Sequence, residues 1–503
     1  MVAAAYYDDA ARRIFVRSHS GRVWGFEGCS QSEWADFMSA TVSKGEYLTR
    51  VLSRKPEVNL GGGGPAPVRG SQALRAAALN AFQPAHEIVD PKKFAGRRNQ
   101  VLDLADALRV SGSVPIIFGD RGLGKSSLAA QGQLIAMGDT DLLGQLGARN
   151  YGLGDDETYI AVFVTCTDGI DSVSGLLERC ILALEDIEAE AIDADAMRLV
   201  DRSRKSKVSL KVFEVETTRT FKRTELAGSG VVRTTEDVLA QLCNRLSETF
   251  DSPLLIIVDE MDRVADKSGL ASIIKRLSTA RLKFVLVGIA QDWSDLMLDH
   301  ASLERQAVPI RVPRMSHAEL ADVVDRASDS LIASGVDLRI SRDVRKRLVD
   351  LSGGFPWFVH VMGQAALLAA LASGRSEVVA EDLIDGVNGL VKNKFAQHFA
   401  DQYQRAVRDS VQREMVLRAF AEYPKQDIPT SVVYPALRSL GVTNPSIYLG
   451  HLCSSAYGEP LIRPGFQGRA LVRFRNEMFR QYVLLAPSLY PGVANDVARA
   501  MRV

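Results

Sequence analysis

A glycine-rich loop that runs into a lysine and a serine has the residue types needed to bind phosphate groups. An apolar, β-branched run, residues 114–118, precedes the loop, and helix-forming residues, 127–137, follow it. Glycines let the backbone curl so that its N–H groups point at phosphate oxygens. We expect Lys125 to reach the β- and γ-phosphates and Ser126 to hold Mg²⁺ at the positive end of the helix dipole. The predicted phosphate-binding residues are Gly119, Asp120, Arg121, Gly122, Leu123, Gly124, Lys125, Ser126 and Ser127.

Two adjacent carboxylates stand at the end of a second apolar run. Asp259 and Glu260 directly follow residues 254–258, which have the composition of a buried central strand. We expect Asp259 to orient Mg²⁺ through its bound waters, and Glu260 to polarise an attacking water as a catalytic residue beside Lys125. A surface Asp-Glu pair would be unremarkable, but a pair that ends an apolar strand indicates a metal-assisted phosphate site.

Taken together, these two motifs predict an α/β fold with a parallel sheet that uses ATP and Mg²⁺ as cofactors. The glycine loop matches the P-loop pattern at every position, and its flanks have the strand–loop–helix order that this motif requires. A glycine-rich turn before an ordinary helix would explain the loop alone, but not the independent acidic pair.

The composition is that of a globular protein with several domains. The chain has 503 residues, of which 46% are hydrophobic and 24% charged, so about three domains are expected. Lys+Arg and Asp+Glu both total 61, so no overall charge excess favours non-specific binding to nucleic acid or an anionic membrane. A local basic face would be hidden in this total.

The cysteines and the apolar segments indicate a cytoplasmic protein. Five cysteines are scattered without any CxxC spacing, which is typical of reduced thiols and does not favour zinc. The first residues have no long apolar core of the kind found in secretory signals. The longest apolar helix candidate, residues 365–372, is too short to span a bilayer.

Residues 1–54 predict a small α+β domain. Strands are expected at 13–17 and 23–26, and a helix at 32–40. This segment resembles the KTSC domain, which implies a binding module rather than a reaction; a packing unit without a ligand is the alternative. The residues that carry the resemblance are Gly21, Trp24, Phe26, Trp34, Phe37, Ala40, Ser43, Gly45 and Tyr47. A flexible, glycine-rich linker is expected at 55–83.

The ATPase core is expected at 84–313. Phe94, Gly96 and Arg97 precede an amphipathic helix and resemble the F-x-GR box of origin-recognition-type AAA+ ATPases and STAND signalling ATPases. The resemblance implies that residues 88–97 line the adenine pocket, with Gly96 and Arg97 binding the nucleotide. A plain loop before a helix would explain the pattern equally well.

Two further candidates in the core come from resemblance to AAA+ proteins. Residues 283–291 resemble the sensor 1 strand, which implies that Gln291, or failing that Asp292, helps to hold the hydrolytic water. Gln291 could instead cap the helix that follows. Arg305 falls where AAA+ chains often carry an arginine finger, which would act on a neighbouring subunit and imply a homo-oligomer; a surface arginine is the alternative.

An insertion separates the expected strand at 160–165 from the strand that ends at Asp259. Its residues 207–223 alternate apolar and polar positions, which predicts a β-hairpin. Such a hairpin could contact a partner or DNA, but a solvated decoration of the core is the simpler interpretation.

A helical lid is expected at 314–400. Ser316 and Glu319 form a capping-box pattern. Residues 353–358 resemble the GxP motif of STAND ATPases, which implies that Pro356 packs on the adenine side of the nucleotide. The usual AAA+ sensor-2 arginine is absent before Arg375. This departure favours the STAND branch and puts rapid, continuous hydrolysis in doubt.

Residues 401–503 predict a winged-helix domain. Helices are expected at 411–422 and 431–440, and a recognition helix at 447–453 begins after Asn444, an expected N-cap. A hairpin wing at 461–474 carries arginines that could meet phosphates: Arg469, Arg473 and Arg475. The recognition helix, however, has no Arg or Lys for base edges. In STAND proteins such a domain packs on the ATPase and locks it.

The sequence therefore predicts a Mg-dependent ATPase of the AAA+/STAND superfamily that acts as a nucleotide-driven conformational or assembly switch. Its hydrolysis would be slow, and the trigger and effector would be separate proteins. The resemblance implies a role in bacterial stress signalling or phage defence. The alternative is a DNA-binding AAA+ loader or transposition regulator that uses the winged helix. A scaffold that holds nucleotide without turnover is the third possibility.

Overall fold

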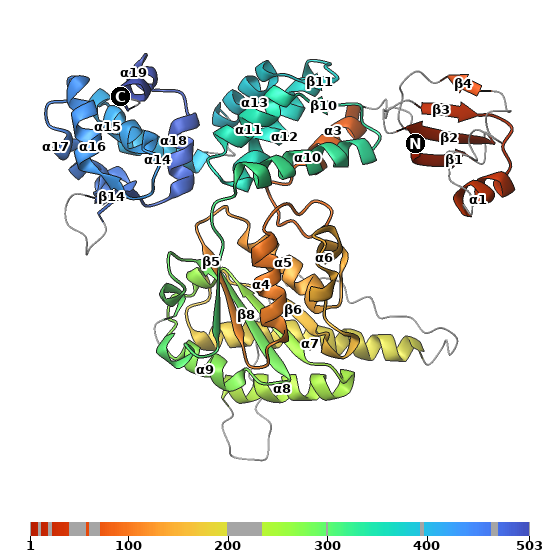
Figure 1. Cartoon of the computed structure of the whole chain (residues 1–503). Coiled ribbons are helices and arrows are strands. Elements are labelled where there is room, and N and C mark those ends of the chain that lie inside the picture. Colours follow the sequence, from red (N-terminus) through yellow and green to blue (C-terminus); the bar gives the residue numbers. More distant parts are fainter. Residues whose placement is uncertain are drawn as a thin grey trace.

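The computed structural model describes most of the chain, and Figure 1 shows how its parts follow one another. The described residues are 2–8, 12–18, 23–39, 57–59, 71–198, 234–297, 300–392, 397–463 and 471–501. The hairpin predicted at 207–223, Gly21 and the KTSC-like positions from Ala40 onward, and Arg469 lie outside these residues.

A five-stranded parallel sheet forms the centre of the ATPase core, as predicted. The strand order is β6-β7-β8-β5-β9, and every pair in it is parallel. Strands β5 and β7 are buried along their whole length, which is why their sequences read as continuous apolar runs. The strands are β5 (Val114–Gly119), β6 (Ile160–Thr165), β7 (Leu254–Asp259), β8 (Leu282–Ile289) and β9 (Ala307–Arg311).

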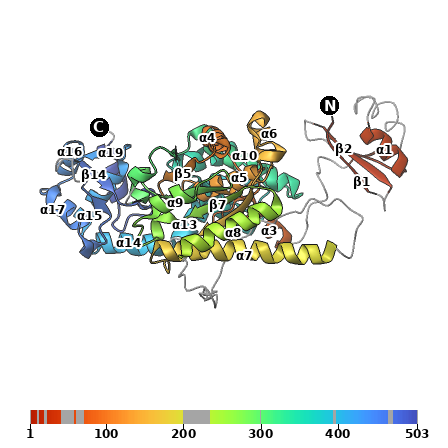
Figure 2. The same ribbon diagram turned by 90° about the horizontal axis from the view of Figure 1, so that it is seen from below.

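Helices cover both faces of this sheet (Figures 1 and 2). Alternate residues of each strand enter different cores: Leu255 and Ile257 pack with α4 and α5, whereas Ile256 packs with α7, α8 and α9. This division follows from the two-residue period of a strand. The helices are α4 (Arg98–Arg109), α5 (Lys125–Ala136), α6 (Asp141–Gln145), α7 (Val173–Arg198), α8 (Thr235–Phe250) and α9 (Leu270–Leu277).

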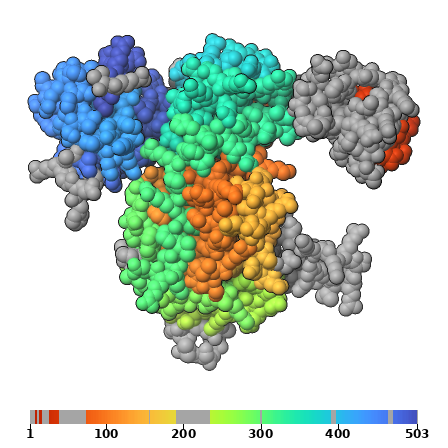
Figure 3. Space-filling model, in the orientation of Figure 1, coloured from red at the N-terminus to blue at the C-terminus, as the bar shows by residue number. Residues whose placement is uncertain are grey.

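A helical lid stands above the loops that leave the sheet (Figures 1 and 3). The predicted capping box is present: Glu319 N–H donates to Ser316 Oγ at 3.3 Å, and Ser316 N–H donates to Glu319 Oε2 at 2.9 Å. The lid comprises α10 (His317–Ala333), β10 (Arg339–Ile340), α11 (Arg342–Leu351), α12 (Pro356–Ala372), β11 (Glu377–Val378) and α13 (Ala380–Lys392).

One helix of the lid's packed body comes from the range that we expected to be a linker. Helix α3 (Ser71–Ala81) contacts α10 and α12, and Phe82 after it is completely buried. Its alanines and Leu74 give it a small apolar face, but no strong periodicity in the sequence marked that face. The range 55–83 is therefore not a flexible linker throughout.

The C-terminal residues form the predicted winged-helix arrangement of helices and a small antiparallel sheet in the order β12-β14-β13. One detail differs: Pro445 is the first residue of the helix, as predicted, but the Asn444 side chain makes no capping hydrogen bond. The elements are α14 (Gln397–Val407), α15 (Val411–Glu422), β12 (Ile428–Pro429), α16 (Thr430–Ser439), α17 (Pro445–Leu452), β13 (Leu461–Ile462), β14 (Leu471–Phe474), α18 (Glu477–Leu485) and α19 (Val493–Met501).

The N-terminal unit is a small α+β structure, as predicted. Its antiparallel sheet has the order β1-β2-β3-β4, and its core includes Ile14, Phe26 and Phe37. Strand β1 was not predicted, because its alanine-rich sequence lacks the usual β-branched residues. The elements are β1 (Val2–Asp8), β2 (Arg13–Ser18), β3 (Val23–Phe26), α1 (Gln31–Ser39) and β4 (Glu57–Asn59).

Candidate functional site

The glycine-rich loop joins β5 to α5 with the backbone curl that a phosphate-binding loop needs. Gly122 has a φ of 76°, in the left-handed region that favours glycine. At Gly119 a Cβ would lie 2.5 Å from the carbonyl oxygen of Val312, so no larger residue fits beside β9. The strand, loop and helix predicted from the sequence are all present at the predicted residues.

Lys125, the first residue of α5, is buried and faces a cluster of acids. Its ammonium group donates a hydrogen bond to the backbone carbonyl of Asp120 at 2.8 Å. Burial lowers the pKa of Lys125, and the carboxylates of Asp259, Asp262 and Asp120 oppose that shift. A neutral carbonyl is a weaker partner for an ammonium group than a phosphate oxygen. The lysine can therefore exchange its present partner for a bound phosphate.

The two predicted metal-binding residues meet at the carboxyl end of β7. The Ser126 hydroxyl and the Glu260 backbone N–H both donate to the Asp259 carboxylate, the latter at 2.7 Å. Burial raises the pKa of Asp259 to about 6, although these bonds and Lys125 oppose the shift. A hydroxyl and a carboxylate oxygen are suitable donors for a small hard cation such as Mg²⁺. These residues fit the predicted metal.

Glu260 occupies an unusual backbone conformation at the start of the short 3₁₀ helix η4 (Met261–Arg263). Its φ of 56° lies in the left-handed region, which is uncommon for a residue with a side chain and is found often at functional sites. Its carboxylate pairs with Arg263 Nε at 2.8 Å, and Arg263 also reaches Asp168 at 3.3 Å. The carboxylate of Glu260 is therefore engaged by Arg263 in this structure.

A cavity of about 250 Å³ brings the predicted residues of the core and the lid together. Lys125, Ser126, Asp259 and Glu260 line it from the core, and Pro356 lines it from the lid. Further described residues around the predicted base side are His86, Glu87, Ile88, Lys93, Phe94, Ala95 and Arg97. The segment at 88–97 thus borders the cavity.

Hydrogen bonds to α5 hold part of this segment in place. The Ile88 N–H donates to Ser127 Oγ at 2.9 Å, and Gln131 Nε2 donates to the carbonyls of Ile88 and Val89, each at 2.8 Å. Ser127, predicted to bind phosphate, thus serves here to position the wall of the cavity. Helix α5 therefore carries Lys125 and also holds the backbone of residues 88–89 at the wall of the cavity.

Arg97 has a connecting role that the sequence did not predict. Its buried guanidinium donates to the carbonyls of Leu123 at 2.9 Å and Pro313 at 2.6 Å, and its backbone N–H donates to Glu319 Oε1 at 2.9 Å. Burial lowers the pKa of Arg97 to about 10, although the negative charge of Glu319 acts to raise it. Arg97 therefore links the glycine loop to Pro313, where the chain passes from the core to the lid, and to helix α10 of the lid.

Gly96 supports the same junction by allowing close approach. A Cβ at Gly96 would lie 2.8 Å from Glu319 Cβ, and its φ is 63°. Gly96 is not among the described residues that line the cavity. The position needs glycine because the lid lies against it, and this accounts for Gly96; Arg97 beside it does border the cavity.

Gln291 lies beside the glycine loop but outside the lining of the cavity among the described residues. Its Nε2 donates to Asp120 Oδ1 at 2.6 Å, and its Oε1 accepts from Gln426 Nε2 of the winged-helix unit at 3.4 Å. The capping alternative was wrong for Gln291: the cap of the short helix η5 (Trp293–Leu296) is Asp292, which accepts from Ser294 N–H at 3.0 Å.

Arg305 is exposed on the turn after the short helix η6 (His300–Ser302) and does not line the cavity of its own chain among the described residues. This position leaves it available to a second copy of the chain. Its role as an arginine finger stays a prediction.

Two aromatic residues that the sequence analysis missed border the cavity next to Pro356, the first residue of α12. Trp357 Nε1 donates to the carbonyl of Pro84 at 3.1 Å, and His360 Nδ1 accepts from the Gln83 N–H at 3.3 Å. The signal that would have found His360 is its spacing of four residues from Pro356, which places both on one helix face.

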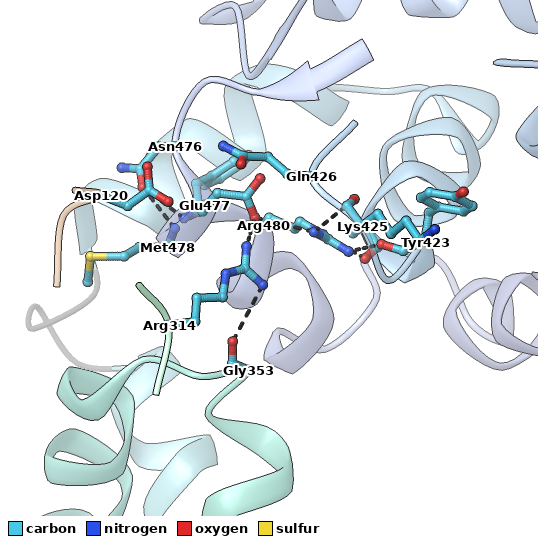
Figure 4. A network of polar contacts seen from close by, with 12 residues as sticks. Asp120, Arg314, Gly353, Tyr423, Lys425, Gln426, Asn476, Glu477, Met478 and Arg480 are labelled. Atoms are coloured by element: carbon cyan, nitrogen blue, oxygen red, sulfur yellow. Dashed lines mark hydrogen bonds and ion pairs between the residues drawn. The ribbon is translucent and has the colours of Figure 1, made fainter. Parts of the chain in front are cut away.

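The winged-helix unit contacts both the lid and the glycine loop (Figure 4). Glu477 on α18 is buried between two arginines: it forms an ion pair with Arg314 and one at 3.3 Å with Arg480. Arg314 also lies 4.9 Å from the ring centre of Phe355 at the start of the lid helix. Met478 packs on Gly122, where a Cβ would lie 2.7 Å from its sulfur.

Two of the wing arginines that were expected to meet phosphates, Arg473 and Arg475, have partners within the winged-helix unit. Arg473 donates to Asp427 Oδ2 at 3.0 Å, and Arg475 pairs with Glu459 at 2.6 Å. Each positive charge is compensated locally, which weakens this face as a nucleic-acid surface.

The glycine loop, the acidic pair at the end of β7 and the parallel sheet under a helical lid define a P-loop nucleotide-binding protein of the AAA+/STAND class. A model of the family described as Novel STAND NTPase 1 matches residues 77–417. The chain belongs to this family. The match begins after the N-terminal unit and does not test its resemblance to the KTSC domain.

The chain is also similar to several solved structures. Cdc6p from Pyrobaculum aerophilum is 14% identical with a TM-score of 0.40, over 84% of this chain and 99% of that one. The Aeropyrum pernix ORC1 protein, solved in complex with DNA, is 15% identical with a TM-score of 0.39, over 82% and 95%. The Thermotoga maritima RuvB Holliday junction branch migration motor is 13% identical with a TM-score of 0.35, over 76% and 93%.

No curated protein matches the chain. Among the residues that the structure describes, no helix combines the length and the apolar character needed to cross a membrane.

Proposed function

We propose that this protein is a Mg-dependent ATPase that works as a nucleotide-driven switch. The observation that carries the proposal is the cavity, whose walls belong to two different bodies. The core contributes Lys125, Ser126 and Asp259, whereas the lid contributes Pro356 and Trp357. A nucleotide that contacts both walls binds one arrangement of core and lid better than another, and this difference is what a ligand needs in order to shift a conformational equilibrium.

In this proposal each residue of the core has a separate task. Lys125 binds phosphate oxygens, and Ser126 and Asp259 hold Mg²⁺, which supplies charge neutralisation when bound. Glu260 leaves Arg263 and polarises the attacking water. The ion pair of Glu260 with Arg263 at 2.8 Å is partly exposed, so opening it costs only about 0–1 kcal/mol and adds little to the barrier.

We propose that the winged-helix unit restrains the nucleotide site instead of reading DNA sequence. The contacts of Met478 with Gly122 and of Glu477 with Arg314 support this role. Helix α18 touches both the glycine loop and Arg314, which lies between the core and the lid, and so holds the distance between them constant. The restraint would be released when a separate trigger protein acts, and residues 1–54 are our candidate for its binding module.

Met478→Ala tests this restraint. We expect nucleotide to exchange several-fold faster, because the side chain that packs on the glycine loop is removed while the buried ion pairs remain. Release of a fluorescent ADP analogue by stopped flow measures the rate. The matched control is Met501→Ala, since Met501 lies on α19 of the same unit. An unchanged release rate in a folded Met478→Ala protein would contradict the proposed restraint.

Arg305→Ala tests for assembly in trans. We expect the variant to bind ATP normally, but its turnover should no longer rise with protein concentration, because an arginine finger serves the neighbouring subunit. Turnover at several concentrations, together with light scattering, checks this. Unchanged turnover and unchanged assembly would remove Arg305 from the mechanism.

The molar mass of Glu260→Gln in solution separates the switch from the DNA-loader alternative. It is measured with and without ATP–Mg²⁺, and each sample with and without duplex DNA. Assembly with ATP alone supports a signalling oligomer that recruits an effector, as in the stress or phage-defence role that the STAND resemblance implies. Assembly only with DNA would favour the loader or transposition regulator.

A further inference from the structure

The lid wall of the cavity contains a histidine that the proposed mechanism does not use. His360 lies on α12, one turn after Pro356, and borders the same cavity as Lys125 and Ser126. Residues four apart on a helix share a face, so the histidine and the proline form one wall. Trp357 and Phe94 also border the cavity, which gives it apolar surface for a flat ring.

The hydrogen bond at Nδ1 determines which ring nitrogen of His360 carries the proton. The Gln83 backbone N–H donates to Nδ1 at 3.3 Å, so Nδ1 acts as the acceptor and is not protonated. Burial, helped by the nearby positive charge of Lys93, lowers the pKa of His360 to about 4. The imidazole is therefore neutral at neutral pH, and its single proton is on Nε2.

Nε2–H is the ring donor that the bond at Nδ1 leaves over. Among the described residues, no hydrogen bond to this nitrogen is present, and the atom is not sealed within the protein interior. His360 borders the cavity and its Nδ1 already accepts from the Gln83 N–H, so Nε2 is the ring nitrogen left for a ligand in the cavity. A donor placed at the edge of a largely enclosed site favours a ligand that offers an acceptor there.

We propose that His360 reads the base of the bound nucleotide by donating its Nε2 proton to an unprotonated ring nitrogen of adenine. The phosphates are expected at the other end, where the glycine loop and Lys125 lie, so an acceptor near His360 belongs to the base. The Gln83 N–H holds the imidazole in the tautomer that can donate. The inference rests on the proposed function, because it assumes that the nucleotide is ATP.

The experiment pairs changes in the protein with changes in the ligand. The dissociation constants of ATP, 1-deaza-ATP, 3-deaza-ATP, 7-deaza-ATP and inorganic tripolyphosphate are measured for the wild type, His360→Phe and His360→Gln. Phenylalanine keeps a ring but removes the donor, whereas glutamine retains a donor at a similar distance from the backbone. The matched control is His317→Phe, because His317 is an exposed histidine on the lid.

We expect His360→Phe to weaken ATP binding roughly tenfold, as for the loss of one hydrogen bond in an enclosed site. One deaza analogue should bind the wild type equally weakly and should lose nothing further in His360→Phe, which identifies the ring nitrogen. Binding of tripolyphosphate should not change, and His360→Gln should recover part of the affinity for ATP. The His317→Phe control should match the wild type.

Two results would overturn the inference. If every deaza analogue binds the wild type as tightly as ATP does, no ring nitrogen accepts from His360, and this holds even if His360→Phe fails to fold. If His360→Phe weakens tripolyphosphate as much as ATP, the histidine only supports the fold of the lid. If neither ATP nor tripolyphosphate binds the wild type, the proposed ATPase function itself is wrong, and the inference falls with it.

Discussion

Replacement of Lys125 by alanine should raise the dissociation constant for ATP by at least about a hundredfold. The lysine is the buried cation at the start of α5, and its present partner is only the backbone carbonyl of Asp120. Bound phosphates would supply stronger, charged partners in a site with little water. Without the ammonium group, the carboxylates of Asp259 and Asp262 would instead repel the phosphates.

Binding of a fluorescent ATP analogue, followed by competition with ATP, measures this effect. The matched control is Lys275→Ala, because Lys275 is an exposed lysine on α9 and should be replaceable without loss of affinity. A normal melting temperature for Lys125→Ala would exclude unfolding as the cause. Unchanged ATP affinity in Lys125→Ala would refute the nucleotide site.

Replacement of Glu260 by glutamine should leave ATP bound but slow its hydrolysis by about a hundredfold to a thousandfold, the range expected for removal of a general base. Glutamine has nearly the same shape, but its amide cannot accept a proton from water. The backbone at Glu260, with a φ of 56°, is unusual for any residue with a side chain, so glutamine should adopt it with a similar cost.

Release of phosphate under saturating ATP–Mg²⁺ measures the turnover, and ATP binding is measured in the same samples. Glu248→Gln is the matched control, since Glu248 is exposed and pairs with Arg281 on the surface of the core. If Glu260→Gln turns over like the wild type, another residue must position the water. Gln291 would then be a poor replacement, because its amide group is bonded to Asp120 and Gln426.

The chemistry of the phosphate end was determined by local sequence. The curl of the loop depends on glycines that are neighbours in the chain, and the position of Asp259 follows from the apolar strand directly before it. Such features need only the conformations of adjacent residues and the alternation of a buried strand. For this reason Lys125, Ser126, Asp259 and Glu260 were predicted as a group, and the structure brings them to one cavity.

The contacts between domains were decided by the tertiary structure alone. The Arg97 N–H bonds to Glu319 of the lid, Gln291 joins Asp120 to Gln426, and Glu477 pairs with Arg314. In each of these pairs more than a hundred residues separate the partners along the chain. No periodicity or local motif records such a partner, because the contact depends on how whole domains pack.

Helix α12, which borders the cavity where we expect the base to bind, has one feature that the sequence determined and one that only the tertiary structure decided. The sequence determined that Pro356 opens a lid helix, because a proline after two glycines can end one helix and begin the next. It did not determine that the Gln83 N–H would meet His360, since Gln83 lies before the core and His360 lies within the lid. Only the packing of α3 and Phe82 against α12 brings these two segments together, and that packing fixes which nitrogen of the imidazole faces the cavity.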